Sequence, residues 1–248
     1  MKDFYELYNC YLKINRMEWI KSRRRGPSGI GYTFESLLGK EEDTFSIPDF
    51  KSVEIKTMRI RSRKVLHLFC LTPDGDYLFP IKRLLESLGY PSRWNSSYKV
   101  FMINVNSLSY SKIGLSKKVK LFVNWKKEKL ELLAFKSTGE KIDIEVSWSF
   151  CLLKETLERK LKNLAIIQAR NKIIDMEEYF WYSYIYLYQL KSFEVFLSLI
   201  EKGFITVTFN IDVFKNEKRY GQIYDHGTYF SINFSHIEKL FERIYLDV

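Results

Sequence analysis

The sequence has few of the residues that covalent or metal-held frameworks need. It contains three cysteines, Cys10, Cys70 and Cys151, which lie far apart and form no Cys-x-x-Cys pair. Neither a disulfide framework nor a structural zinc site is supported, and the chain is expected in the cytoplasm. The low content of glycine, 11 residues, and of proline, 5 residues, excludes a collagen-like or low-complexity protein.

Long hydrophobic runs are also missing. The most apolar stretch, residues 179–200, is interrupted by Gln189, Lys191 and Glu194, so no transmembrane helix and no membrane partner are expected. The first residues, MKDFYE, carry two acids and show no small-residue cleavage site behind an apolar run. No signal peptide is predicted.

Positive charge and aromatic side chains are abundant. Forty Lys and Arg residues against thirty Asp and Glu give a formal net charge of +10, which favours an anionic partner such as nucleic acid or a membrane surface. A chain of 248 residues, 46% of them hydrophobic, can bury a sizeable core. Without internal repeats or a flexible linker, residues 1–248 are expected to form a single domain with two lobes.

Hydrophobic periodicity predicts a mixed α/β core. Helices are expected at residues 2–20, 33–38, 81–88, 152–161 and 190–200. Strands are expected at residues 53–57, 65–71, 119–125, 130–135, 141–146, 164–167, 182–188 and 204–213, followed by a hairpin through residues 225–227. Residues 90–111 are polar and are expected to be irregular, and His67, on an apolar strand, is assigned to the core.

One short segment has the residue types that metal-dependent phosphodiester cleavage needs. Asp49, Glu54 and Lys56 have the spacing Asp-x4-Glu-x-Lys. Two carboxylates supply the oxygen ligands that Mg²⁺ prefers, and a neighbouring lysine can orient the attacking water or stabilise charge on the phosphoryl oxygens. Alternation along a strand places Glu54 and Lys56 on the same face, and the backbone carbonyl of Ile55 is a further candidate ligand. The spacing alone is expected about 0.4 times by chance in such a chain, and a solvated strand face is the alternative.

The surrounding residues resemble a known family. They are RRGPSGIGYTFESLL at residues 24–38, IPDF at 47–50, VEIKT at 53–57, WSF at 148–150, KLK at 160–162 and DHGT at 225–228. This order resembles the MvaI/BcnI family of type II restriction endonucleases and, more distantly, MutH-like repair nickases, all within the PD-(D/E)XK nuclease superfamily. The resemblance covers most of the chain and is poor between residues 71 and 116.

The resemblance implies a fold, an activity and roles for the segment. The fold would be a PD-(D/E)XK nuclease core, with a mixed central sheet flanked by helices and a DNA cleft between two lobes. The activity would be Mg²⁺-dependent cleavage of double-stranded DNA at a specific site, with catalytic elements mainly in residues 20–70. Asp49 and Glu54 would bind the metal, Lys56 would lie beside the attacking water, and Glu35 would support the site from the preceding helix.

Basic residues beside this segment are candidates for DNA contact. Arg23, Arg24 and Arg25 lead into a Gly-Pro-Ser-Gly loop that contains Ser28, and such a loop can hold phosphates through side chains and backbone N–H groups. Arg61 and Lys64 follow the candidate catalytic strand and are also assigned to phosphate contact. A solvated basic surface is the alternative for both groups.

Base recognition is expected from two later segments, residues 90–111 and 204–235. The resemblance assigns Asp225 and His226 to this role and implies a short site of the CCNGG kind. In the family a histidine can precede the aspartate and an arginine can follow it, whereas this chain has Tyr224 and Ser231. The base sequence that is read therefore remains open.

The family pattern also implies a monomer and a cognate DNA methyltransferase that protects the host. Two alternatives remain at this point. A MutH-like nickase would cut one strand after activation by a partner, and a silent relative would bind DNA without cutting it.

Overall fold

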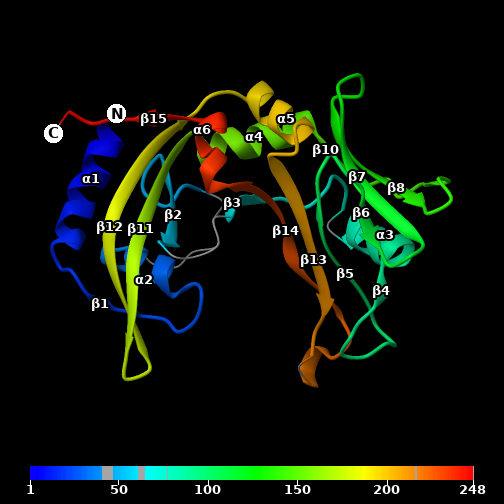
Figure 1. The fold of residues 1–248 in the computed structure, drawn as a ribbon, viewed down its shortest axis with the longest axis horizontal. Helices are drawn as coiled ribbons and strands as arrows, with labels where there is room; N and C mark the ends of the chain where they lie inside the picture. The colour runs from blue at the N-terminus through cyan, green and yellow to red at the C-terminus, as the bar shows by residue number, and fades with distance from the viewer. Residues whose placement is uncertain (41–46, 61–64, 77, 216, 248) are drawn as a thin grey trace. The chain divides into compact units, whose positions relative to one another are not determined.

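The computed structural model describes residues 1–40, 47–60, 65–76, 78–215 and 217–247. Its elements group into two compact units (Figure 1). Unit 1 contains residues 1–64, 157–191 and 238–248, and unit 2 contains residues 65–156 and 192–237. Within the described ranges, no helix is long and apolar enough to cross a membrane.

Unit 1 is built on a five-stranded mixed sheet. Its strands are β1 (Ile20–Lys21), β2 (Val53–Arg59), β11 (Asn163–Ile174), β12 (Glu177–Leu190) and β15 (Phe241–Ile244). The order is β1-β12-β11-β2, with β15 paired to β12. Strand β2 runs parallel to β11, which is antiparallel to β12. The mixed sheet flanked by helices expected from the sequence is therefore confirmed, with β2 at its edge.

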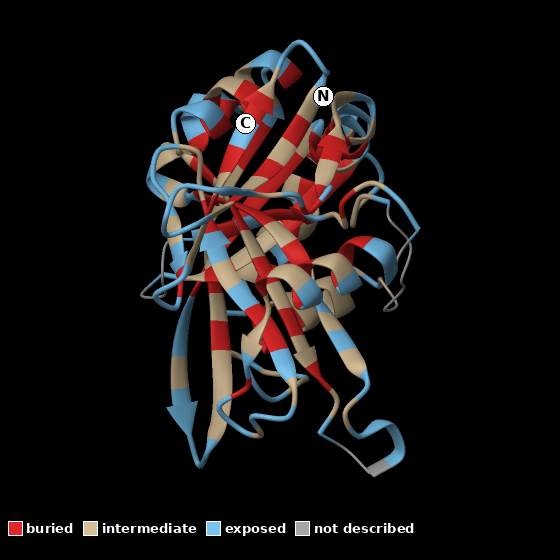
Figure 2. Ribbon diagram, turned by 90° about the vertical axis from the view of Figure 1, so that its right-hand side faces the viewer, coloured by how far each residue is buried: buried red, intermediate tan, exposed pale blue. Residues whose placement is uncertain are grey.

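Helices α1 (Lys2–Asn15) and α2 (Gly29–Leu37) cover one face of this sheet. Their apolar side chains form a core with inward-facing residues of the strands, which appears as red bands in Figure 2. Its members include Phe4, Leu7, Phe34, Val53, Ile55, Ala165, Ile167 and Tyr182. Because side chains alternate along a strand, burial of Val53 and Ile55 in this core directs Glu54 and Lys56 to the opposite face.

The long hairpin of β11 and β12 turns at Asp175 and Met176, whose φ angles of 50° and 60° suit the tight hairpin turn that follows the twist of the strands. Its tip is open to solvent, since Met176 is 93% exposed. Nearer the core, the Tyr182 hydroxyl donates to the carbonyl of Ile30 at 2.8 Å. Tyr182 therefore packs in the core, whereas Tyr184 is 45% exposed.

Unit 2 contains two five-stranded sheets. One has the order β3 (Val65–Cys70), β14 (Ile223–Asn233), β13 (Ile205–Val213), β5 (Lys99–Val105) and β4 (Tyr90–Pro91). The other has the order β10 (Ser147–Ser149), β8 (Lys129–Lys136), β7 (Lys117–Asn124) and β6 (Ser111–Ile113), with β9 (Lys141–Ile142) paired to β8. Buried aromatic rings of Trp148, Phe209 and Phe230 pack together in this unit.

The remaining helices lie between strands along the chain. They are α3 (Leu78–Leu88), α4 (Phe150–Leu161), α5 (Phe193–Glu201), α6 (Ile237–Leu240) and the 3₁₀ turns η1 (Glu217–Arg219) and η2 (Phe234–His236). Helix α4 passes from unit 2 into unit 1 and leads directly into β11.

Several boundaries differ from the sequence prediction. The first helix ends at Asn15, because residues 20–21 pair with β12 as strand β1. Helix α2 begins at Gly29 rather than at Thr33. The strand expected at residues 141–146 is reduced to β9 at residues 141–142.

Three predictions in unit 2 are wrong. Residues 90–111 are not irregular throughout, because Val100, Phe101 and Val105 are buried and residues 99–105 form β5 between β4 and β13. The hairpin turn lies at residues 214–222, so Asp225 and His226 lie within β14. His67 is exposed and not in the core, because its side chain lies on the outer face of β3, where Nδ1 is 2.8 Å from the Ser231 hydroxyl.

Candidate active site

Glu54 and Lys56 form an ion pair on the edge strand β2. The Lys56 Nζ atom lies 2.5 Å from Glu54 Oε1, as expected for side chains two residues apart on one strand. Glu54 is only 6% exposed, because neighbouring side chains cover that face of the sheet. The structure thus brings together two of the three residues of the predicted trio.

Asp49 contacts the backbone of β2 at Ile55, the residue between Glu54 and Lys56. Its Oδ2 atom accepts the N–H of Ile55 at 3.0 Å, and its Oδ1 atom accepts from Lys40 Nζ at 2.8 Å. The N–H and C=O of one strand residue point to the same side. The carbonyl of Ile55 therefore points away from β11, toward the side occupied by Asp49.

Glu35 lies on α2 and is half-buried. It interacts electrostatically with the charged residues of this cluster, Asp49, Lys40, Lys56 and Glu54. Burial raises its pKa above the usual range, the charge of Asp49 raises it further, and Lys40 and Lys56 oppose the change. Burial likewise raises the pKa of Glu54, against the opposing attraction of Lys56. Burial is thus the main cause of both shifts, and the attraction of the lysines opposes it.

The donor set fits a hard divalent cation. Asp49, Glu54 and the Ile55 carbonyl supply oxygen atoms, which Mg²⁺ prefers, and a cation would relieve the cost of ionising the buried Glu54. Among the residues that the structure describes, no three His, Cys, Asp or Glu side chains converge as a metal site. Glu35 interacts electrostatically with both carboxylates.

The basic loop before α2 is held in place by its own contacts. The guanidinium of Arg24 lies 3.9 Å from the ring centre of Tyr32, and the backbone N–H of Arg23 donates to the Thr33 hydroxyl at 2.9 Å. A side chain at Gly29 would come within 2.3 Å of the Arg24 carbonyl oxygen, so this close approach requires glycine. The loop is thus locally ordered.

The individual cations differ in their exposure. Arg23 and Arg25 are exposed and Arg24 is half-buried, while Arg25 lies 3.9 Å from a carboxylate oxygen of Glu177. Ser28 is the exposed N-cap of α2, and its side chain makes no capping hydrogen bond there. The two other predicted phosphate contacts, Arg61 and Lys64, lie outside the described residues.

The two segments expected to recognise bases meet within unit 2. Trp94, in the turn before β5, lies edge-on to Tyr220, in the β13–β14 turn, with 5.3 Å between ring centres. Lys215 Nζ lies 5.8 Å from the Trp94 ring centre. A side chain on Gly221 would come within 2.5 Å of the Tyr98 hydroxyl oxygen, so the two turns approach closely at this glycine.

Asp225 and His226 lie at an irregularity in β14. The register with β13 shifts between Phe209 and Ile211, as in a β-bulge, which redirects side chains. The Asp225 carboxylate accepts the N–H of Gly227 at 2.8 Å, and the His226 ring contacts the Tyr224 ring in a tilted arrangement, with 4.1 Å between ring centres. Burial raises the pKa of Asp225.

The contact between Lys40 and Asp49 was not predicted from the sequence. Lys40 lies nine residues before Asp49, beyond the end of α2, and residues 41–46 between them are not described. The sequence offered no signal for this pair, since loop residues have no periodicity that predicts contacts.

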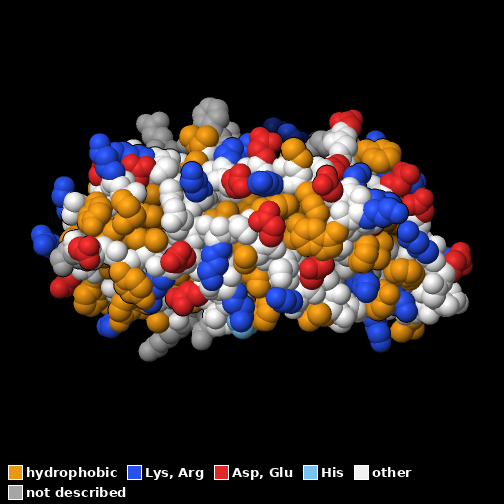
Figure 3. Space-filling model, turned by 90° about the horizontal axis from the view of Figure 1, so that it is seen from above, with side chains coloured by type: hydrophobic (Ala, Val, Ile, Leu, Met, Phe, Trp, Pro, Cys, Tyr) orange, Lys and Arg blue, Asp and Glu red, His pale blue; other side chains and the backbone are white. Residues whose placement is uncertain are grey.

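Positively charged side chains are mixed with other kinds on one face of the surface. On the face shown in Figure 3, Lys and Arg side chains alternate with acidic and apolar ones. Among the described side chains drawn there, Lys and Arg do not gather into one continuous patch of the kind expected of a DNA-binding surface.

Comparison with known proteins identifies the family. The model of the MvaI/BcnI restriction endonuclease family matches residues 10–241. None of the curated protein sequences matches the chain. Among solved structures, the complex of restriction endonuclease MvaI with cognate DNA substrate is similar, with a TM-score of 0.88, 28% sequence identity and 98% of each chain covered. MvaI in the absence of DNA has a TM-score of 0.64 at 28% identity, covering 98% of this chain and 97% of that chain. The chain therefore belongs to the MvaI/BcnI restriction endonuclease family and is a site-specific DNA nuclease.

Proposed function

We propose that this protein is a Mg²⁺-dependent type II restriction endonuclease that hydrolyses both strands of DNA at a short specific site. The observation that carries the proposal is the cluster on β2, in which a buried carboxylate, Glu54, lies 2.5 Å from the ammonium of Lys56 and Asp49 is hydrogen-bonded to the intervening residue, Ile55. Carboxylates and a lysine in this arrangement suit metal-assisted hydrolysis of a phosphodiester.

Each residue of the cluster has a distinct role. Asp49, Glu54 and the Ile55 carbonyl would hold Mg²⁺. When bound, the ion would polarise the scissile phosphate and lower the pKa of a bound water molecule. Lys56 positions the attacking water and stabilises charge on the phosphoryl oxygens. Glu35 acts through Asp49 and Lys56 as a positioning residue, consistent with the electrostatic coupling to both.

The substrate is double-stranded DNA, which MvaI binds in one of the similar structures. Arg23, Arg24, Arg25 and Ser28 contact phosphates, and Asp225 with His226 reads base edges, since a carboxylate can accept from the cytosine N4 amino group. This suits a C/G-rich site of the CCNGG kind. We further propose that the protein acts as a monomer in the cytoplasm, beside a methyltransferase that protects host DNA.

The first test is digestion of unmethylated phage DNA by the purified protein in Mg²⁺, with EDTA and Lys56→Ala as controls. Discrete fragments that vanish in both controls support the proposal, and sequencing of their ends gives the site. A matched control, Lys51→Ala, removes a lysine that pairs with Glu6 on the surface of the same unit and is expected to cut normally.

The number of strands cut distinguishes this activity from that of a partner-dependent nickase. Supercoiled plasmid is expected to pass through an open circle to a linear product. A product that stays nicked at one strand contradicts double-strand cleavage, and uncut DNA with retained binding contradicts autonomous activity.

A further inference from the structure

The sheet face that carries Glu54 and Lys56 continues along β11 beyond the active site. Lys56 pairs with Ile166 in the parallel register of β2 and β11, so residues 168, 170 and 172 share that face. Arg170 lies four residues beyond Ile166, about 13 Å along the strand. All of these residues belong to unit 1.

Two cations lie over two tryptophans at this end of the sheet. Lys172 Nζ is 4.1 Å from the ring centre of Trp19, and the Arg170 guanidinium is 5.4 Å from that of Trp181. The two indole rings meet edge-on at 5.9 Å. We call these four residues, with Tyr184, the cation–indole patch.

The patch borders an open hollow of about 760 Å³, which Ile60 and Ile173 also line. Arg170 is exposed and Tyr184 is 45% exposed. Trp19 and Trp181 are half-buried, so part of the aromatic surface of the patch is open to solvent and does not serve only to fill a core.

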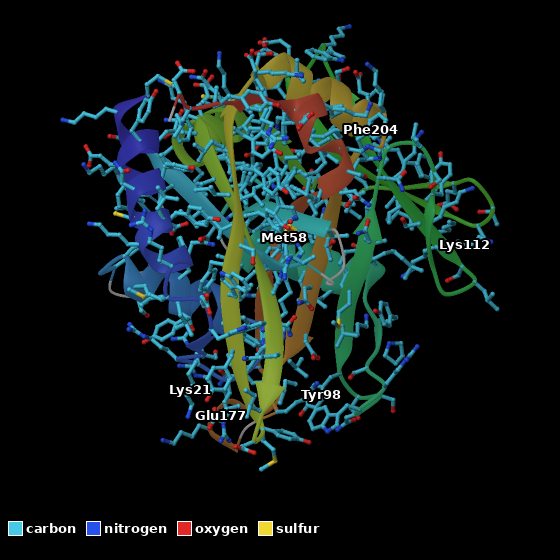
Figure 4. All side chains as sticks on the ribbon, turned by 60° about the vertical axis from the view of Figure 1, so that its left-hand side comes forward. Lys21, Met58, Tyr98, Lys112, Glu177 and Phe204 are labelled. Atoms are coloured by element: carbon cyan, nitrogen blue, oxygen red, sulfur yellow. The ribbon has the colours of Figure 1, made fainter. Side chains whose placement is uncertain are left out.

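Within the part of the chain that the structure describes, neither Arg170 nor Lys172 forms an ion pair with an acidic side chain. The nearby cations Lys21 and Arg25 differ, since both lie within 4 Å of Glu177 Oε1, at 3.6 and 3.9 Å. Figure 4 shows Lys21 and Glu177 together near the end of the β11–β12 hairpin.

We infer that the cation–indole patch binds the DNA backbone beside the cleavage site, an inference that rests on the proposed function. Cations without an acidic partner attract phosphates, and the half-exposed aromatic rings beside them can pack against the sugars of the same backbone. A displacement of about 13 Å corresponds to about four base pairs at 3.4 Å each. The patch therefore lies within reach of a duplex whose scissile phosphate is at Lys56.

The test is the salt dependence of DNA binding without Mg²⁺, measured by fluorescence anisotropy on a 30-base-pair duplex. Each lost phosphate contact lowers the slope of log Kd against log salt by about 0.9, so Arg170→Ala/Lys172→Ala is expected to lower it by about 1.8. Trp19→Ala is expected to weaken binding while leaving the slope unchanged, because the indole ring carries no charge.

A matched control removes two charges from the other side of the same sheet. Lys2 and Lys13 are exposed on α1, which packs on the opposite face of the unit 1 sheet, so Lys2→Ala/Lys13→Ala is expected to keep the parent slope. Cooperative thermal unfolding followed by circular dichroism, with the parent midpoint kept by each variant, reports that the variants are folded.

The outcomes separate the two proposals. If the parent protein cuts DNA but the Arg170→Ala/Lys172→Ala variant has the slope of the control, the patch does not bind DNA and only this inference fails. If the parent neither binds nor cuts DNA, the proposed function fails and the inference fails with it.

Discussion

Lys40 and Asp49 form an ion pair, with 2.8 Å between Nζ and Oδ1. The two side chains are each 19% exposed, so solvent screens the pair less than it would at the surface. The carboxylate proposed as a metal ligand is therefore already neutralised by a lysine, and a divalent cation has to compete with Lys40 for the same oxygen.

This competition predicts the effect of Lys40→Met. Without the ammonium, the Mg²⁺ concentration for half-maximal cleavage is expected to fall about two- to fivefold, which matches the energy of about 0.5–1 kcal/mol for such a pair. A Mg²⁺ titration of the cleavage rate measures the change. Lys51→Met removes an exposed lysine paired with Glu6 and is expected to leave the titration unchanged. A higher Mg²⁺ requirement in Lys40→Met would instead show that Lys40 holds Asp49 in place for the metal.

Glu54→Gln is expected to stabilise the metal-free protein at neutral pH. Burial raises the pKa of Glu54, so folding favours the protonated carboxyl. This contribution is fully present below the unfolded pKa and is lost as the pH rises through the raised folded pKa. Glutamine stays neutral at every pH, and the midpoint of unfolding is expected to rise by about 2–4 °C, the shift that 1 kcal/mol produces in a domain of this size.

Thermal unfolding in EDTA between pH 4 and pH 8 checks this prediction. The difference between Glu54→Gln and the parent is expected to vanish at the acidic end, while the variant loses cleavage in Mg²⁺. A variant that is less stable than the parent at pH 8 would mean that the ion pair with Lys56 outweighs the cost of burial.

Glu178→Gln is expected to destabilise unit 1 with the opposite dependence on pH. Both Glu178 oxygens accept from the Arg59 guanidinium, each at 2.7 Å, and Oε1 also accepts from Asn171 at 3.0 Å. The hydrogen bond from Arg59 lowers the pKa of Glu178. Its stabilisation is present above the unfolded pKa and is lost as the pH falls through the lowered folded pKa.

The expected loss of unfolding free energy at pH 7 is about 1–3 kcal/mol, as for hydrogen bonds to charged groups. Urea denaturation at pH 7 and pH 3 measures it, with the effect smaller at pH 3. Glu140→Gln breaks an exposed pair with Lys136 and is the control, with a change below about 1 kcal/mol. Equal losses of unfolding free energy in Glu178→Gln and Glu140→Gln would contradict the prediction. They would mean that the pair of Arg59 on β2 with Glu178 on β12 stabilises unit 1 no more than an exposed ion pair does.

Asp225→Asn tests base recognition in unit 2. An acceptor lost from a base edge is expected to lower kcat/KM at the target site about 5- to 150-fold, the effect of about 1–3 kcal/mol. Non-specific binding without Mg²⁺ is expected to stay the same, because phosphate contacts supply it. Asp212→Asn, on the same hairpin, removes a carboxylate that is held by Lys215 and is the matched control. Unchanged cleavage of the target by Asp225→Asn would exclude this residue from recognition.

Local patterns were enough for the elements that carry the cluster on β2. Alternation at residues 53–57 predicted that Glu54 and Lys56 share one face, and apolar stripes predicted the two helices that the structure packs on the other face, α1 and α2. Strands alternating with helices predicted a mixed α/β core, whereas the mixed sheet was implied by the family resemblance. These properties depend on residues close in the sequence, where helix and strand periods are directly visible.

The same patterns failed where long-range pairing determines the structure. Strand β5 has no regular alternation, and its pairing with β13 joins Phe101 to Ile211, more than one hundred residues away. The β13–β14 turn was predicted at residues 225–227 because a glycine follows Asp225 and His226, yet that glycine, Gly227, has a φ of 114° at an irregularity within the strand. Glycine serves both turns and bulges, so composition alone does not distinguish them.

The residues with candidate chemistry were thus recognisable in the linear chain, because Asp49, Glu54 and Lys56 are neighbours on one strand and its approach. Their surroundings were not, because the ion pair of Lys40 with Asp49, the partial burial of Glu35 and the indole rings of Trp19 and Trp181 beside Arg170 and Lys172 join segments that only tertiary packing brings together. Periodicity encodes which face a residue occupies, whereas contacts between distant segments depend on the summed packing of the whole unit.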